Sequence, residues 1–350
     1  MKFINNSLAM KKVLFTLLCV IWVQFSAQAQ DYPLIPDHPG TFKLIDWGVY
    51  THWDCGFTKA ETSANYQKII GITDLVRKNP VFIDQKGFEC ETYVFAKNCP
   101  GKFGYGIPSE IRFGFGDWFM DKGQPKYYKI EPPSWTIQVN NLNYFAGSSY
   151  SSGTSKPTEK PKEDFNYEKW ESVGAKLHEC FYIPGQKEEL GPGIDRYISE
   201  IIVLYNPERP PYYLPVKFRE IAEWLIGYWK LHPDKLQSDM ICGMMEAEYA
   251  KFSETERDGW AYHNTYDERS PVLQITTVPG SQPVVRLNPE YWNKKLPRSA
   301  IQMLTFNRLT DTNRYTKEIE ESLKYNSNGY SLDRFLEALD INTLVPTIDK

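Results

Sequence analysis

The chain has 350 residues, of which 41% are hydrophobic and 15% aromatic, and a formal net charge of −4 at pH 7. So many core-forming residues exclude global disorder, and the mild acidity without a basic stripe argues against a nucleic-acid-binding surface. The length suits one large domain or two ordinary ones.

Residues 1–29 are predicted to be a secretory signal peptide. Lys11 and Lys12 form a basic region, residues 13–23 an uncharged, mainly apolar run, and Ala27-Gln28-Ala29 a small-x-small cleavage pattern. The run would rise only about 16 Å as a helix, whereas a bilayer core requires about 20 residues, so a membrane anchor is disfavoured. We therefore expect an exported protein, periplasmic or extracellular, without a membrane span in the mature chain.

Two features qualify this leader. Met10 stands directly before the basic region, so translation starting there would give a more compact signal. Cys19 is a poor lipidation site, because Leu17 and Leu18 before it are large and the apolar run continues past it. We expect the mature chain to begin at Gln30.

Cysteines in an exported chain meet oxidising conditions, so disulfides are permitted. Five cysteines follow the leader, an odd number that leaves at least one thiol over: Cys55, Cys90, Cys99, Cys180 and Cys242. Cys90 and Cys99 can pair only if residues 96–98 turn the chain back; otherwise we expect Cys55 to pair with one of them. Cys242 lies among methionines in a helical segment and is interpreted as a buried free thiol.

Residues 147–163 are rich in Ser, Pro and Lys and are predicted to form a linker or an exposed loop. We place a boundary there, between a β-rich domain at 30–146 and an α+β domain at 164–350. The alternative, an insertion within one domain, stays open.

In the first half, a helix is expected near residues 61–78. Two segments, 110–116 and 135–139, alternate apolar and polar residues as half-buried strands do. Pro132-Pro133 excludes a helix before the second strand, and Asp121-Lys122-Gly123 fits a turn between the two.

The second half mixes the two periodicities. Its predicted elements are a buried strand at 197–205, an edge strand at 212–214, helices at 217–231 and from Pro233 to about 252, a hairpin of 272–277 with 283–287, a helical turn after Asn288, a strand at 300–306, and helices near 315–325 and 331–340, the last capped by Ser331. The order predicts an α+β fold, with a β-rich N-terminal half followed by an antiparallel sheet with packed helices in the C-terminal half.

Standard catalytic and cofactor signatures are absent, including the Gly-x-Ser-x-Gly, His-Glu-x-x-His, P-loop and Cys-x-x-Cys patterns. The densest polar cluster spans residues 254–269. His263 is the candidate proton shuttle, with Asp258 or Asp267 to orient it and Glu256 as a further catalytic carboxylate. Binding candidates in the same segment are Trp260, Tyr262 and Tyr266. The alternative is a solvated connection whose aromatic rings pack back on the core.

Aromatic residues also decorate the N-terminal strands. Trp118 and Trp135, with Tyr127 and Tyr128, would form a binding platform if they shared an exposed face; alternatively they belong to the core. No cofactor is predicted, and no metal site, because His52-Trp53-Asp54-Cys55 and His178-Glu179-Cys180 have no further ligands that the sequence can place beside them.

Two functions follow. The first is a non-catalytic binding or interaction protein for a protein or glycan partner. The second is a secreted hydrolase, acting on glycans, that uses carboxylates and the histidine of the 254–269 cluster. A glycosidase would need two carboxyl groups about 5–5.5 Å or 6.5–9.5 Å apart.

Overall fold

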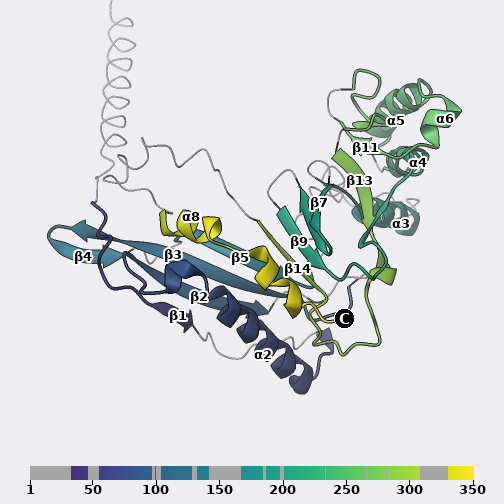
Figure 1. Ribbon diagram of the computed structural model, residues 1–350. Coiled ribbons are helices and arrows are strands. Elements are labelled where there is room, and N and C mark those ends of the chain that lie inside the picture. The colour runs from purple at the N-terminus through teal and green to yellow at the C-terminus, as the bar shows by residue number, and fades with distance from the viewer. Residues whose placement is uncertain are drawn as a thin grey trace, which may run out of the picture.

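A computed structural model describes residues 33–45, 55–96, 99, 104–127, 132–141, 167–183, 187–197, 201–232, 234–264, 267–280, 282–307 and 330–350. The predicted leader, the segment 147–163 and the helix near 315–325 lie outside the described residues. The fold is α+β, as predicted, and contains mixed sheets with packed helices (Figure 1).

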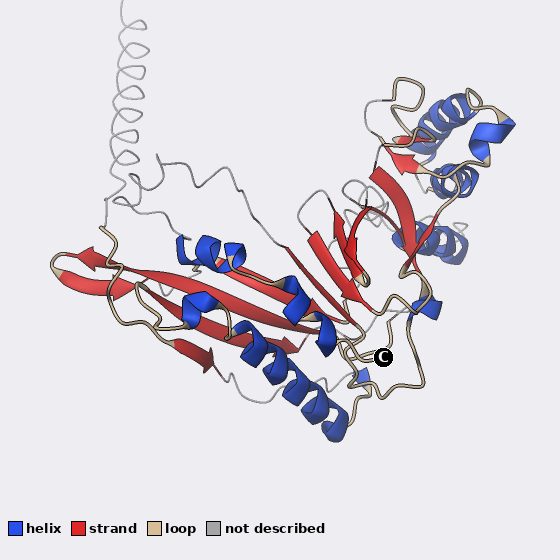
Figure 2. Ribbon diagram, in the orientation of Figure 1, coloured by secondary structure: helices blue, strands red, loops and turns tan. Residues whose placement is uncertain are grey.

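The larger sheet has nine strands and extends from the long body at the left of Figures 1 and 2 to shorter strands at the centre right. Its order is β1 (Phe42–Ile45), β2 (Phe88–Ala96), β3 (Ser109–Asp121), β5 (Ser134–Val139), β14 (Met303–Asn307), β9 (Ile201–Tyr205), β8 (Ile194–Tyr197) and β7 (Lys187–Gly191), with β4 (Gln124–Tyr127) beside β3. The β1–β2 pair is parallel and the other pairs are antiparallel.

The sheet crosses the boundary predicted at residues 147–163. Strand β5 precedes that segment and β14 follows it, yet Ile137 and Phe306 are direct cross-strand partners. Strand β9 then pairs with the other edge of β14. The predicted boundary therefore does not separate two sheets, because β-pairing is non-local and a polar segment in sequence does not reveal which strands meet in space.

One face of this sheet carries the first hydrophobic core. Helices α2 (Lys59–Val76) and α8 (Tyr330–Glu337) cover it (Figure 1). Ile111, Phe113 and Phe115 point into it, which confirms the alternation read from the sequence. Helix α2 begins where expected, with a capping box formed by Thr58 and Glu61.

Three details around this core differ from the prediction. The turn after Asp121 joins β3 to β4 rather than to β5, with Lys122 and Gly123 at φ 51° and 75°. The segment 197–205 is split between β8 and β9, which pair with each other. Ser331 lies inside α8 instead of capping it, and its hydroxyl donates to the buried Asp117 carboxylate of β3.

The second sheet has five strands: β10 (Tyr213–Pro215), β13 (Gln282–Leu287), β11 (Tyr262–His263) and β12 (Ile275–Thr276) in spatial order, with β6 (Cys180–Tyr182) beside β13. The predicted hairpin of 272–277 with 283–287 is wrong, since β11 lies between β12 and β13 and pairs with both. Strand β12 is also shorter than the predicted strand at 272–277, because the backbone N–H groups of Val272 and Leu273 donate to the Glu248 carboxylate.

Four helices pack around this sheet and enclose a second core (Figure 2). They are α3 (Tyr167–His178), α4 (Phe218–Lys230), α5 (Lys235–Tyr249) and α6 (Glu254–Arg257). The predicted periodicity of α4 is confirmed, since Ile221, Leu225 and Tyr228 are buried. Helix α5 begins after Asp234, whose side chain accepts from the Gln237 N–H as an N-cap.

A third apolar cluster joins the two sheets. Val203 of β9 and Val285 of β13 both belong to it, together with Tyr212 and Trp292. Short 3₁₀ turns complete the fold at η2 (Pro80–Phe82), η3 (Pro289–Tyr291), η4 (Ile341–Thr343) and η5 (Val345–Thr347). Asn288 caps η3 through the Glu290 N–H, as predicted. Among the described helices, none is long and apolar enough to cross a membrane.

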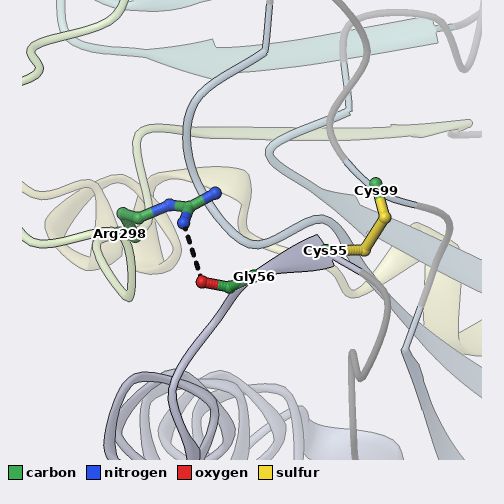
Figure 3. The surroundings of a disulfide bond; sticks show 4 residues. All are labelled: Cys55, Gly56, Cys99 and Arg298. Carbon is green, nitrogen blue, oxygen red and sulfur yellow. Dashed lines mark hydrogen bonds between the residues drawn. A yellow bond between two sulfur atoms is a disulfide. The ribbon is translucent and has the colours of Figure 1, made fainter.

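Cys55 and Cys99 are joined by a disulfide, with their Cα atoms 5.1 Å apart (Figure 3). The pairing resolves the sequence alternatives in favour of Cys55. Next to it, the Arg298 guanidinium donates to the Gly56 carbonyl at 3.2 Å. Cys90, Cys180 and Cys242 are buried free thiols, as predicted for Cys242; burial raises the pKa of Cys180 to about 12.

Candidate functional site

An open groove of about 370 Å³ lies where α4 begins beside the end of α6. Charged residues dominate its lining, which consists of Lys217, Arg219, Glu220, Glu223, Trp224 and Asp258. Asp258, at the C-terminal cap of α6, is the one member of this set that the sequence singled out.

Backbone pairing holds the two sides of the groove together. The Phe218 N–H donates to the Gly259 carbonyl at 3.0 Å, and Lys217 forms an isolated β-bridge with Trp260. The ammonium of Lys217 donates to the Asp258 carbonyl at 2.7 Å and lies 3.8 Å from the centre of the Trp260 ring. Trp260 is 46% exposed and contacts Lys217 of the groove, although it is not itself among the lining residues.

Most charges of the groove are neutralised within the chain. Arg219 donates to Glu254 at 2.6 Å and to Asp258 at 3.0 Å, and these bonds raise its pKa. Glu220 is paired with Arg286 at 3.2 Å.

Glu223 differs from its neighbours. It is exposed and lines the groove, and within the described part of the chain no ion pair neutralises it. The adjacent Trp224 ring carries the Lys176 ammonium at 5.6 Å from its centre. The groove therefore offers one unneutralised carboxylate next to an indole ring.

The other predicted catalytic carboxylates also hold internal partners. Glu256 forms a capping box with Ser253 and an ion pair with Arg269 at 2.8 Å, and the Ser253 backbone bond in particular lowers its pKa to about 2. Burial alone would raise the pKa of Asp267, but hydrogen bonds from Thr276 and Arg269 lower it. Both carboxylates are thereby fixed as ionised acceptors.

His263 lies outside the groove lining, on β11. Its ring is stacked on Tyr182 with centroids 4.1 Å apart and an interplanar angle of 12°. Burial lowers the pKa of the ring. Tyr262 precedes it on the same strand, half-buried, and Tyr266 lies outside the described residues. His263 is therefore not among the residues that line the groove with Asp258.

We expect His263→Ala to lower the free energy of unfolding by about 1–2 kcal/mol, because the stacked ring is lost. His263→Phe keeps the stacking and should retain most of the stability at pH 7. Because the folded-state pKa is depressed, the neutral ring stabilises the protein above about pH 6.5, and this contribution is lost as pH falls through the folded pKa. Urea unfolding from pH 8 to 5 should show a decline in the free energy of unfolding that His263→Phe lacks. The same decline in His263→Phe would contradict the role of His263 in this pH dependence.

The two tryptophans of the predicted platform lie on opposite faces of the large sheet. Trp135 pairs with Phe113, faces the first core and is 3% exposed, so it offers no binding surface. Trp118 is half-buried on the other face, stacked on His38 at 3.9 Å and next to Tyr127 at 4.9 Å. Its indole N–H donates to Glu89 at 3.3 Å.

Most of the groove is not apparent from the sequence. The periodicity of residues 217–231 places Trp224 with the apolar face of a helix and gives Arg219 and Glu223 no role. A signal was present: the two charged residues are four positions apart and share the polar face of α4 next to an indole. That pattern also describes an ordinary solvated helix, and only the contact with α6 distinguishes the two.

Within the described residues, no group of three or more His, Cys, Asp or Glu side chains is placed to hold a metal ion. No family model, curated protein or solved structure matches this chain.

Proposed function

We propose that this chain is an exported, non-catalytic binding protein that holds a partner protein through a Lys or Arg side chain placed in the groove at α4. The observation that carries the proposal is the unneutralised Glu223 carboxylate beside the Trp224 ring. A cation is attracted both by a carboxylate and by the face of an indole.

The internal contacts of the groove support a cationic ligand. Lys217 already lies over the Trp260 ring at 3.8 Å, and Lys176 over Trp224 at 5.6 Å. Each indole thus has a face on which an ammonium group is accommodated. A basic side chain entering the groove would pair with Glu223, which forms no ion pair within the described part of the chain.

The state of the predicted catalytic acids favours binding over hydrolysis. A glycosidase needs a carboxylic acid that remains protonated until it donates its proton. Glu256 and Asp267 instead have lowered pKa values and arginine partners. We therefore place the secreted hydrolase second.

Export is supported by the leader at residues 1–29 and is compatible with the Cys55–Cys99 disulfide. Mass spectrometry of the protein from its native source should find Gln30 at the N-terminus. A chain that retains Met1 or Met10 outside the cytoplasm would exclude the cleaved signal.

The groove is tested with a tetralysine peptide, tetraglutamate and chitotetraose, each titrated against the mature chain by tryptophan fluorescence. We expect saturable binding of tetralysine alone, weakened about tenfold by Glu223→Gln, a loss that equals about 1.4 kcal/mol. Glu208→Gln is the matched control, because Glu208 is exposed and lies outside the groove lining. Binding of chitotetraose alone would instead assign a glycan ligand, and tetralysine binding unaffected by Glu223→Gln would place the site elsewhere.

A further inference from the structure

The Cys55–Cys99 disulfide belongs to none of the three apolar clusters of the protein. Cys99 is exposed and Cys55 is half-buried, whereas the thiols of Cys90, Cys180 and Cys242 are buried. Exchange of a disulfide requires that a thiolate gain access to one of its two sulfur atoms. Among the cysteines that the structure describes, this pair is therefore the one that a thiol from solution can reach.

The bond joins two segments whose neighbouring elements are held independently by the fold. Cys55 precedes α2, whose first turn has its own capping box, and Cys99 follows β2. Ile69, Ile72 and Val76 fix the later turns of α2 in the first core. Strand β2 pairs with β3 along its whole length. Breaking the disulfide should therefore leave the core and the sheet intact and release only the chain around the bond.

The chain at Cys55 is also held by contacts that do not involve sulfur. The Arg298 guanidinium donates to the Gly56 carbonyl at 3.2 Å, as Figure 3 shows, and lies 4.0 Å from the centre of the Phe57 ring. These contacts remain when the disulfide opens. The two sulfur atoms therefore differ in role, because that of Cys99 is the more accessible to attack and that of Cys55 lies on the anchored side.

We propose that this disulfide is a thiol-exchange site, at which an oxidoreductase carrying two thiols attacks Cys99 and releases Cys55. The partner's thiolate bonds to the Cys99 Sγ, the bond between Cys99 and Cys55 breaks, and its electron pair leaves on the Cys55 Sγ, which takes up a proton. The partner's second thiol then attacks the mixed disulfide and releases Cys99. The partner ends with an internal disulfide and this chain with two thiols, so two electrons and two protons have passed to it.

Opening the bond acts on local structure. The disulfide joins residues 44 apart in sequence, and the loop that it closes contains the whole of α2 and β2. Once the bond is open, the start of α2 keeps its capping box and the contacts of Arg298 but loses its covalent link to the chain after β2. The exchange site would thereby determine how firmly the start of α2 is held, independently of the groove at α4.

Reduction of the native mature chain tests whether the bond is accessible. The chain is treated with dithiothreitol, a small dithiol, without denaturant, then with iodoacetamide, and its peptides are analysed by mass spectrometry. We expect Cys55 and Cys99 to be alkylated, while Cys90, Cys180 and Cys242 stay unmodified because the fold keeps them buried. Reduction that occurs only in urea, or only together with alkylation of the three buried thiols, would overturn the proposal.

Hydrogen exchange before and after this reduction tests the local effect. Amides of residues 57–62 should lose protection, while those of β3 keep it. Unchanged protection at residues 57–62 would exclude control over the start of α2, and a loss in β3 as well would show that the disulfide holds the whole core.

The direction of attack is tested by trapping. The probe is a Cys-x-x-Cys oxidoreductase whose second cysteine is replaced by serine, so that the mixed disulfide cannot be resolved. After acid quenching, peptide mapping should find the probe attached to Cys99 and none attached to Cys55. Cys99→Ser is the control, because it has no disulfide to attack and should trap nothing. Attachment to Cys55, or to both cysteines equally, would overturn the assigned direction.

Discussion

Replacing Asp195 with alanine should lower the free energy of unfolding by about 3–5 kcal/mol, as expected when one member of a buried charged network is removed. Asp195 lies on β8 and is fully buried. Its carboxylate accepts from the hydroxyls of Tyr212 at 2.5 Å and Tyr205 at 3.2 Å, and Lys187 lies 3.5 Å away. Tyr197 bonds to the Tyr212 hydroxyl at 2.7 Å.

The magnitude follows from what the substitution leaves behind. Without the carboxylate, buried hydroxyl donors lose their acceptor, and each costs about 1–3 kcal/mol. Tyr205→Phe removes a single donor and should cost only about 1 kcal/mol. Urea unfolding of the two variants measures the difference, and a loss below about 1 kcal/mol in Asp195→Ala would show that water replaces the carboxylate.

The same network predicts a response to alkaline pH. Burial raises the pKa of Tyr197 and Tyr212 above the usual value of about 10. Their stabilisation is therefore present in full below about pH 10 and is lost as pH rises toward the folded-state values. In Asp195→Ala, the free energy of unfolding should already be lower at neutral pH, before the decline at alkaline pH begins.

Phe335→Ala should cost about 3–5 kcal/mol, the typical range for removing a buried phenylalanine. Phe335 of α8 is fully buried, and its ring lies 5.1 Å from that of Trp135 and 5.2 Å from that of Phe115. Together with Leu336, it packs α8 into the first core. The cavity would be lined by aromatic rings from β3, β5 and η2, which cannot collapse easily because the sheet fixes the positions of the strand residues.

Hydrogen exchange separates two ways in which this loss can appear. If α8 detaches alone, amides of residues 330–337 lose protection while those of β3 keep it. If the core unfolds as a unit, both lose protection together, which we expect because Ser331 also bonds to Asp117 of β3. Glu337→Ala is the matched control, since Glu337 is exposed on the same helix; a similar loss in this variant would mean that the effect does not come from packing of the Phe335 ring.

Local sequence patterns predicted helices and strands well where neighbouring residues alone determine the structure. The alternation of Ile111, Phe113 and Phe115 gave β3 with its buried face, and the periodicity of α4 gave its packing side. Asn288 before Pro289 gave η3. In each case, the physical cause lies within a few residues of chain.

Long-range partners could not be inferred in this way. Ser331 resembles an N-cap, but its bond goes to Asp117, which lies far away in sequence. Strand β11 consists of only Tyr262 and His263, which is too short for an alternating pattern to be recognised. It lies between β12 and β13, so these two strands do not form the predicted hairpin. The candidate site could not be predicted fully for the same reason. Glu256, Asp258 and Asp267 are recognisable in the sequence, but the arginine residues that pair with them, and so determine their chemistry, are not.

The pairing of β5 with β14 also sets the order in which the chain can fold. Leu304 is the cross-strand partner of Val139, so this contact closes a loop that spans nearly half of the 350 residues. Contacts of such long sequence separation slow folding. During synthesis, the inner edge of β5 stays unpaired until β14 has emerged, close to the end of the chain. Until then, the incomplete chain presents an unpaired β5 edge to which a strand of another chain can add, so it gains from chaperones that shield strand edges.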